Sequence, residues 1–533
     1  MRHVDNIILG AGPAGLQLGH LLQERGERYL IIERSSRVGS FFSRFPRHGK
    51  LLSINKVYTG CEDRESRRRY DWNSLLCDDP QLQFARYSRD YFPSASALCQ
   101  YLEDFARVLA LEVLRSSPVV RVRPRADAGG YEIELASGER LTCARLFVGT
   151  GLSVERLPAV PGVELCESYG TCSLDPNDFT DQRVMIIGKG NSAFETADNL
   201  IGTTRKLWIV GAENVRLAWG THYVGDVRAV NNNFLDTYQL KAQNNILDGE
   251  FRGVRRDPDS GELIAEVYFA SRARSFDFRC DRVILCTGFK FDATIFDPRC
   301  SPALCPAGKL PVMTSAWEST NCPEMFFIGV LMQARDYRKT MSAFIHGFRH
   351  NIEALDMIVE RRDHPDRGWR RAMPASRRSD ALADLIMERL STSAALLLQP
   401  GFLIDLLGLR HDGGVDYLPS LPESFVHEHL ASDYRRLLTI SLEYKQHEGY
   451  MDPFAMPRGQ GVEEDFYLHP IVRCFEDGAL IARFFLPDDL DNDWRGDPEH
   501  GDRLQRFLEA HLGDPSTRPG TGSRGADPQG LFA

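Results

Sequence analysis

Small residues occur twice in a spacing that suits a dinucleotide cradle. The two sets are Gly10, Gly12 and Gly15, and Gly188, Gly190 and Ala193. In each set the first glycine permits a tight turn and the second lets the backbone approach a pyrophosphate. The third position lets a helix pack closely on a strand. The N-terminus of that helix offers N–H groups and a partial positive charge to phosphates. The sequence therefore predicts two dinucleotide sites.

An acidic residue completes only the first site. Glu33 ends the next expected strand, where its carboxylate can accept hydrogen bonds from the ribose hydroxyls of an adenosine. The matching place after the second set reads Gly211, Ala212 and Glu213, and the nearest basic residue is Arg216. We interpret the first site as one for FAD and the second as one for NADPH or NADH. We favour NADPH slightly, with Arg216 as the phosphate partner.

Strand and helix patterns repeat around both sets and indicate a duplicated architecture. In each block a buried strand, the glycine turn, a helix and a second strand precede a hairpin and a strand that ends in Thr-Gly. We expect an α/β fold with two Rossmann-type domains, the NAD(P) domain inserted in the FAD domain, and a C-terminal α+β region. The expected boundaries are 1–155 and 290–362 for the FAD domain, 156–289 for the NAD(P)H domain, 363–380 for a linker, 381–512 for an accessory domain and 513–533 for a disordered tail.

Composition narrows the class of protein. A chain of 533 residues with 43% hydrophobic residues and a net charge of −10 is typical of a soluble globular protein and disfavours nucleic acid as a partner. The twelve cysteines include no C-x-x-C pair, which argues against a redox dithiol or a zinc knuckle, and we expect no metal site. The sequence shows no secretory signal and no membrane span, so we expect a cytoplasmic protein.

Four longer segments resemble the FAD-dependent oxidoreductase domain-containing proteins, within the flavin-containing monooxygenase-like flavoproteins. They are residues 39–60, 188–202, 215–241 and 336–350. The resemblance implies FAD, a nicotinamide cofactor and oxidoreductase or monooxygenase chemistry. The candidate FAD-binding residues are Gly10, Gly12, Pro13, Ala14, Gly15, Glu33, Arg34, Thr150, Gly151, Gly329 and Asp336. The candidate NAD(P)-binding residues are Gly188, Gly190, Asn191, Ser192, Ala193, Glu195, Arg216 and Gly288.

One signature of flavin-containing monooxygenases is absent. When Gly162 is aligned with the glycine of F-x-G-x-x-x-H-x-x-x-F/Y, Val160 and Cys166 occupy the Phe and His positions. By resemblance, Asn55 would still stabilise an oxygenated flavin or contact the nicotinamide, with Lys56 beside it, and both are our candidate catalytic residues. The alternative is that Asn55 caps a turn.

Polar residues near the expected flavin ring form a candidate substrate pocket. They are His222, Asp226, Arg228, Lys339 and His346. Residues 341–362 are expected to form a long helix whose N-terminus points at the flavin, with His346 one turn or more inside it. Each of these residues could instead have a structural role.

The leading hypothesis is an NAD(P)H- and FAD-dependent monooxygenase that hydroxylates a small molecule with O2 through a C4a-(hydro)peroxyflavin. A reductase or oxidase that releases hydrogen peroxide is the alternative on the same scaffold. A non-catalytic flavoprotein, with residues 381–512 as an interaction surface, is an alternative of another class. The substrate, the oligomeric state and the role of that region stay open.

Overall fold

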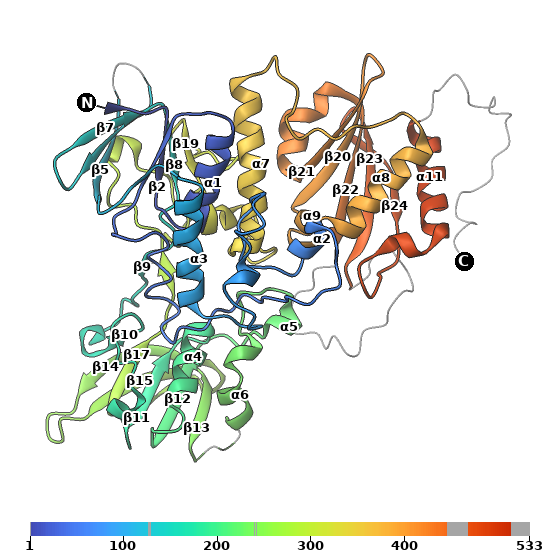
Figure 1. Cartoon of the computed structure of the whole chain (residues 1–533). Helices are drawn as coiled ribbons and strands as arrows, with labels where there is room; N and C mark the ends of the chain where they lie inside the picture. Colours follow the sequence, from blue (N-terminus) through green and yellow to red (C-terminus); the bar gives the residue numbers. More distant parts are fainter. Residues whose placement is uncertain (1, 126–128, 239, 241, 445–466, 513–533) are drawn as a thin grey trace.

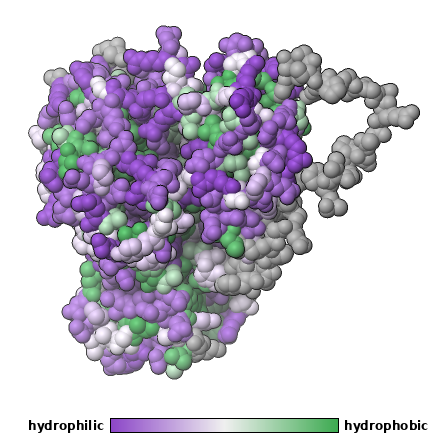
Figure 2. All heavy atoms as spheres, turned by 45° about the vertical axis from the view of Figure 1, so that its right-hand side comes forward, coloured by the Kyte–Doolittle hydropathy of each residue, from purple (hydrophilic) through white to green (hydrophobic). Residues whose placement is uncertain are grey.

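The computed structural model describes residues 2–125, 129–238, 240, 242–444 and 467–512 (Figure 1). The predicted disordered tail at 513–533 lies outside this part of the chain. Most surface residues on the face shown in Figure 2 are hydrophilic, and apolar residues occur there in several separate groups. Within the described residues, no helix combines the length and the apolar character needed to cross a membrane.

A five-stranded parallel sheet forms the first nucleotide domain. Its order is β19 (Met325–Phe327), β8 (Arg145–Val148), β2 (Asn6–Leu9), β3 (Tyr29–Ile32) and β4 (Val113–Leu114). The central strands are apolar and buried because helices cover the sheet. These helices are α1 (Pro13–Glu24), α3 (Ala95–Val108) and α7 (Ile345–Asp363), and the short α2 (Arg64–Arg68) lies in the connection between β3 and α3. Beside them, β1 (Arg2–His3) pairs with the meander of β5 (Val119–Pro124), β6 (Tyr131–Leu135) and β7 (Arg140–Cys143).

The second domain repeats this plan and is inserted between β8 and β19, as predicted. Its parallel sheet has the order β10 (Glu167–Ser168), β17 (Arg282–Leu285), β11 (Arg183–Ile187), β12 (Lys206–Gly211) and β13 (Asn244–Asp248). The helices are α4 (Asn191–Leu200), α5 (Ala218–Thr221) and α6 (Asn233–Thr237), and the meander is β14 (Glu250–Arg256), β15 (Leu263–Phe269) and β16 (Arg274–Cys280). The two chain crossings between the domains pair with each other as β9 (Val154–Glu155) and β18 (Phe289–Lys290).

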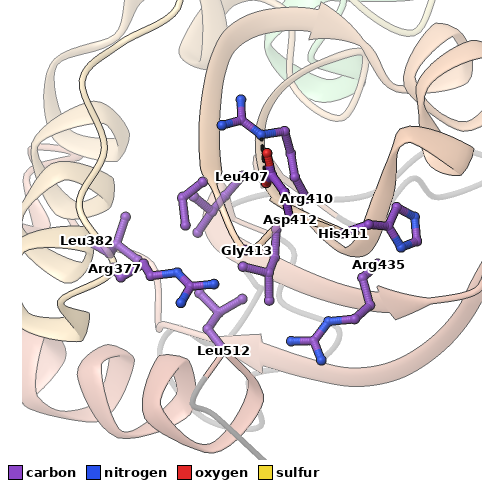
Figure 3. Close-up of a pocket in the computed structure, with 11 residues that line it drawn as sticks. Arg377, Leu382, Leu407, Arg410, His411, Asp412, Gly413, Arg435 and Leu512 are labelled. Atoms are coloured by element: carbon purple, nitrogen blue, oxygen red, sulfur yellow. Dashed lines mark hydrogen bonds and ion pairs between the residues drawn. The ribbon is translucent and has the colours of Figure 1, made fainter.

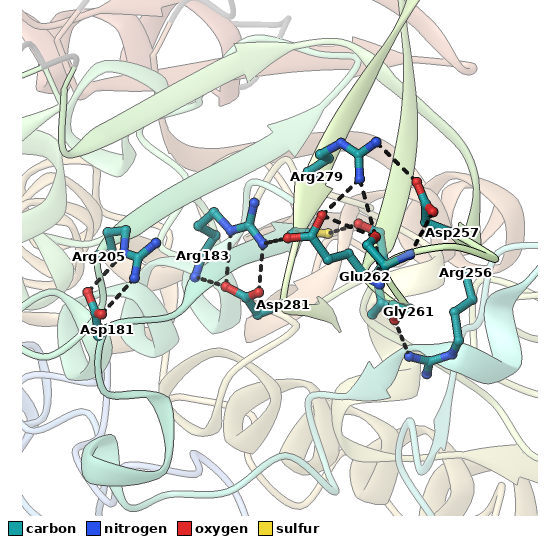
Figure 4. A network of polar contacts seen from close by, with 12 residues as sticks. Asp181, Arg183, Arg205, Arg256, Asp257, Gly261, Glu262, Arg279 and Asp281 are labelled. Carbon is teal, nitrogen blue, oxygen red and sulfur yellow. Dashed lines mark hydrogen bonds and ion pairs between the residues drawn. The ribbon is translucent and has the colours of Figure 1, made fainter.

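A network of ion pairs fixes the second meander to its sheet (Figure 4). Arg183 of β11 pairs with Asp281 and Glu262, each at 2.7 Å. Arg279 of β16 reaches the same Glu262 at 2.8 Å and Asp257 at 3.0 Å. The network therefore links strand β11 to the hairpin ends at the surface, where each pair alone contributes at most about 1 kcal/mol.

The C-terminal region is an antiparallel sheet with helices, as the α+β prediction stated. Its order is β21 (Val415–Pro422), β20 (Leu403–Arg410), β22 (Tyr434–Glu443), β23 (His469–Glu476) and β24 (Ala479–Phe485). The helices are α8 (Ser379–Thr392), α9 (Ala394–Leu398), α10 (Glu423–Phe425) and α11 (Pro498–Leu512). Because strand residues alternate between faces, Leu406 packs with the first domain while Leu407 packs with α8 and α11.

The predicted linker at 363–380 lies against α7. Arg370 pairs with Asp356, and Arg371 pairs with Glu353, both on that helix. Met373 forms a β-bridge with Tyr417 of β21. The linker is thus held between the first domain and the C-terminal sheet.

Candidate functional site

The first glycine turn leaves open space at the start of α1. A Cβ at Gly10 would lie 2.7 Å from the carbonyl oxygen of Gly149, and one at Gly15 would lie 2.0 Å from that of Gly10. A Cβ at Gly12 would meet nothing within 4 Å. Gly12 is also the N-cap of α1 and provides no side-chain cap, so Pro13 and Ala14 begin the helix with its N–H groups open to a ligand. This geometry fits a pyrophosphate.

The carboxyl edge of the first sheet brings the other candidates together. The carboxylate of Glu33 follows β3, is buried, and accepts hydrogen bonds from the amides of Ala11 and Ser35, each at 2.9 Å. Arg34, next to it, is exposed. Thr150 and Gly151 follow β8. After β19, a Cβ at Gly329 would lie 2.7 Å from that of Ala14, so a glycine is needed for the close approach to α1.

Three buried polar groups near this edge have no partner among the described residues. They are Oγ1 of Thr150, Oδ1 of Asp336 and both ring nitrogens of His346. Thr340 donates to the other oxygen of Asp336, and burial raises the pKa of this carboxyl to about 6. Buried polar groups are nearly always hydrogen-bonded, so these atoms fit a polar ligand such as FAD along this edge.

The second glycine turn has the same geometry. A Cβ at Gly188 would lie 2.2 Å from the carbonyl oxygen of Cys286, whereas one at Gly190 would meet nothing within 4 Å. Ser192 and Ala193 lie in the first turn of α4, which has no side-chain cap. Asn191 donates to the carbonyls of Gly225 and Asp226, at 3.1 and 2.8 Å, and so holds the 225–228 loop beside the turn. This arrangement also fits a dinucleotide.

Lys189 is the basic residue that sequence reasoning missed. Its side chain lies 3.1 Å from the place that a Cβ of Gly211 would take, at the end of β12. Its Nζ donates to the carbonyl of Glu213 at 2.8 Å and pairs with Asp248. Arg216, the predicted phosphate partner, instead pairs with Asp226 at 3.1 Å. The signal in the sequence was a lysine inside the glycine turn together with a glycine at the strand end.

Glu195 lies in the contact between the two nucleotide domains. Its carboxylate accepts hydrogen bonds from the hydroxyl of Tyr169 and, at 3.2 Å, from the amide of Arg47 in the first domain. The guanidinium of Arg47 donates to the carbonyls of Gly170 and Cys172 at 2.9 and 2.6 Å. The structure thus gives this predicted NAD(P) ligand an interdomain role. Gly288 lies at the crossing, where its carbonyl accepts from the amide of Arg156 at 2.8 Å.

Glu195 should make the interdomain contact sensitive to pH. Burial raises the pKa of its carboxyl to about 7. A group with a raised folded-state pKa contributes stability that is present below its unfolded pKa and lost as the pH rises through the folded pKa. Glu195→Gln is therefore expected to match the native protein at about pH 4, below the ordinary pKa of 4.5, and to exceed it by up to ~3 kcal/mol at about pH 8. Thermal melts at both pH values test this prediction, with the exposed Glu164→Gln as the control. Equal pH dependence of Glu195→Gln and the native protein would contradict it.

Asn55 has a structural partner. Its buried side-chain amide donates to the carbonyl of Ser88 at 2.8 Å, and its backbone forms a β-bridge with Asp71. Lys56 is exposed. The hydrogen bond agrees with the alternative that Asn55 caps a turn. The catalytic role of Asn55 and Lys56 stays a prediction.

A stack of four side chains joins the second domain to the start of α7. The ring of His346 lies 4.2 Å from that of Trp72 and 5.7 Å from that of Phe344, both nearly parallel to it. The guanidinium of Arg228 lies 5.5 Å from the Trp72 ring. Helix α7 begins at Ile345, so His346 stands in its first turn and not one turn or more inside, because Phe344 is still extended.

The remaining candidates for the substrate pocket also lie where the second domain contacts the start of α7. Buried Asp226 accepts a hydrogen bond from Thr221 at 2.8 Å and lies 3.6 Å from Arg338, the neighbour of exposed Lys339. The ring of His222 lies 5.1 Å from that of Tyr444, whose hydroxyl is 3.5 Å from the Lys339 carbonyl. The structure thus gathers all five predicted pocket residues where 218–233 meets 336–346.

Comparisons with known proteins agree with this geometry. A family model described as "Pyridine nucleotide-disulphide oxidoreductase" matches residues 7–329. The mouse (Mus musculus) FAD-dependent oxidoreductase domain-containing protein 2 is 37% identical over 95% of this chain and 84% of its own length. A zebrafish (Danio rerio) relative with the same name is 34% identical over 94% of this chain and 82% of its own length.

Among solved structures, a flavin-containing monooxygenase from Stenotrophomonas maltophilia aligns with a TM-score of 0.52 at 19% identity, over 68% of this chain and 99% of its own. At this identity the likeness concerns the fold alone. It supports two dinucleotide-binding domains and leaves the reaction to be argued from the site.

Proposed function

Because this chain belongs to the family of FAD-dependent oxidoreductase domain-containing proteins, we propose that it is a flavin monooxygenase that uses NAD(P)H and O2 on a small molecule. The observation that carries the proposal is the pair of glycine turns, each with open space at an uncapped helix N-terminus. FAD, when bound, would accept a hydride and pass electrons to O2. The chain itself would hold FAD at Gly12 and Glu33 and the nicotinamide cofactor at Gly190.

Cys286 favours this proposal over a disulfide reductase. All twelve cysteines are unpaired. Cys286, which touches the second glycine turn, is buried, and burial raises the pKa of its thiol. A thiol with a raised pKa is a poor nucleophile for disulfide exchange, because the thiolate is the reactive form.

The substrate would meet the flavin where 218–233 contacts 336–346. Arg228, Asp226 and His346 offer polar groups there, and the rings of Trp72 and Phe344 flank the buried ring of His346. Such a mixture of aromatic walls and few polar groups is typical of small-molecule sites. The cytoplasmic location and the oligomeric state stay predictions.

Anaerobic reduction followed by oxygen tests the function. The FAD-loaded protein is mixed with NADPH or NADH without oxygen, and flavin absorbance reports reduction. After O2 is admitted, a monooxygenase should regain its oxidised spectrum in two resolved phases and release hydrogen peroxide slowly. Single-phase reoxidation with stoichiometric peroxide would indicate an oxidase. No reduction by either nucleotide would favour the alternative of a non-catalytic flavoprotein.

We further propose that Lys189 reads the adenosine ribose, with Asp248 holding it away from a 2′-phosphate. Asp248→Asn is expected to raise kcat/KM for NADPH relative to NADH by about tenfold, since one charge-assisted hydrogen bond is worth about 1.5–3 kcal/mol. Glu213→Arg should shift the preference in the same direction. Steady-state kinetics with both nucleotides measure the ratio, and the exposed Glu250→Gln on β14 is the control. An unchanged ratio in both variants would show that this strand end does not read the ribose.

A further inference from the structure

A pocket in the C-terminal region contains no residue of either nucleotide domain. It has a volume of about 360 Å³ and opens between the β20–β21 turn, α8 and the end of α11 (Figure 3). Leu512 and Val415 form its partly exposed apolar side, above the buried Leu382 and Leu407. None of the chemistry proposed above uses this pocket.

Guanidinium groups outnumber carboxylates around the pocket. Arg377, Arg410 and Arg435 line it, and Asp412 is the single acidic residue among its lining residues. Arg410 is neutralised by Asp412 at 3.3 Å and by Asp416 at 2.7 Å. Within the described part of the chain, Arg377 and Arg435 form no ion pair. Three guanidiniums therefore face the two carboxylates of Asp412 and Asp416, which leaves the pocket with an excess of positive charge.

The turn between β20 and β21 makes room for two of these groups. A Cβ at Gly413 would lie 2.4 Å from Nη2 of Arg377, and Gly413 has a φ of +87°. A Cβ at Gly414 would lie 2.1 Å from Nη2 of Arg410. Any other residue at these positions would displace a guanidinium, so the glycines help to keep both cations at the pocket.

We propose that this pocket binds an amphipathic monocarboxylate with a short apolar chain. A guanidinium matches a carboxylate in shape and charge, and Leu512 and Val415 would remove the chain from water. At about 30 Å³ per water molecule, the volume corresponds to roughly a dozen heavy atoms. The lining holds no Phe, Tyr or Trp on which a nucleotide base could stack. A carboxylate with an alkyl chain fits these features together.

Calorimetric titration of the FAD-loaded full chain with octanoate tests the proposal. Octanol provides the chain without the charge, and inorganic phosphate provides a charge without the chain. We expect octanoate to bind at least tenfold more tightly than either probe. Arg377→Gln and Arg435→Gln should each weaken octanoate binding by about tenfold, the ratio that one charge-assisted hydrogen bond supports.

Arg378→Gln is the matched control, because Arg378 adjoins Arg377 but already pairs with Asp380. Its octanoate affinity should equal that of the native protein. Absence of octanoate binding, equal affinity for octanol, equal affinity for phosphate, or equal losses in Arg378→Gln and Arg377→Gln would each overturn the proposal. Arg377 is exposed, so its variant should fold even if Arg435→Gln does not, and thermal melts check both.

Discussion

Gly190→Val is expected to abolish reduction of the flavin by NADPH and NADH while the protein still holds FAD. Gly190 has φ −97° and ψ −178°, an extended conformation that valine adopts without strain. The new side chain would project into the open space at the start of α4, where the backbone must approach a pyrophosphate. We expect kcat/KM for both nucleotides to fall by at least about 1000-fold, because a steric block removes most of the binding energy.

The variant that matches Gly190→Val is Gly12→Val, in the first glycine turn. Gly12 has φ −78° and ψ −178°, and its Cβ would also meet open space. Here the expected loss is of FAD itself, seen as a colourless purified protein. Gly202→Val, in an exposed turn after α4, is the control and should change neither property. Normal flavin reduction in Gly190→Val would refute the assignment of the second glycine turn to the nicotinamide cofactor. Normal FAD content in Gly12→Val would refute the assignment of the first glycine turn to FAD.

Local patterns were sufficient to predict both nucleotide folds. The glycine spacing and the apolar strands around Gly10 and Gly188 are short-range signals, and the physical requirement that they express is also local. The structure shows this requirement directly, because a Cβ at Gly10 or Gly188 would collide with the backbone that directly follows the neighbouring strand, β8 or β17. The inserted second domain followed from the repeat of the whole pattern.

Side-chain partners across domains could not be predicted in this way. Glu195 has the same spacing whether it faces a nucleotide or the amide of Arg47, and only the docking of the domains decides. Lys189 reaches the end of β12 because Gly211 lacks a side chain there. The predicted helix at 341–362 started too early. In the structure Phe344 is extended and α7 begins only at Ile345, although the composition of residues 341–344 suits a helix.

Arg349 is another residue whose role only the fold reveals, and its replacement should have the largest effect on stability. It lies on α7 with no exposed surface. Its guanidinium donates to the backbone carbonyls of Arg68, Asp71 and Ser74 at 2.7, 2.9 and 2.7 Å. Burial lowers the pKa of this guanidinium to about 10, so it remains charged at neutral pH. These bonds hold the segment that carries Trp72 against α7.

Arg349→Met should therefore destabilise the protein by about 3–5 kcal/mol, since buried carbonyls would lose their donors while the methionine fills much of the space. Arg349→Lys keeps the charge but not the forked geometry, so its free energy of unfolding should lie between those of the native protein and Arg349→Met. Arg362→Met, on the same helix but with exposed ion pairs, should cost less than about 1 kcal/mol. Denaturant unfolding of the FAD-loaded protein measures all three. If the cost of Arg349→Met equalled that of Arg362→Met, the 68–74 segment would have to be held by other contacts, and the stack of Trp72 on His346 would not depend on Arg349.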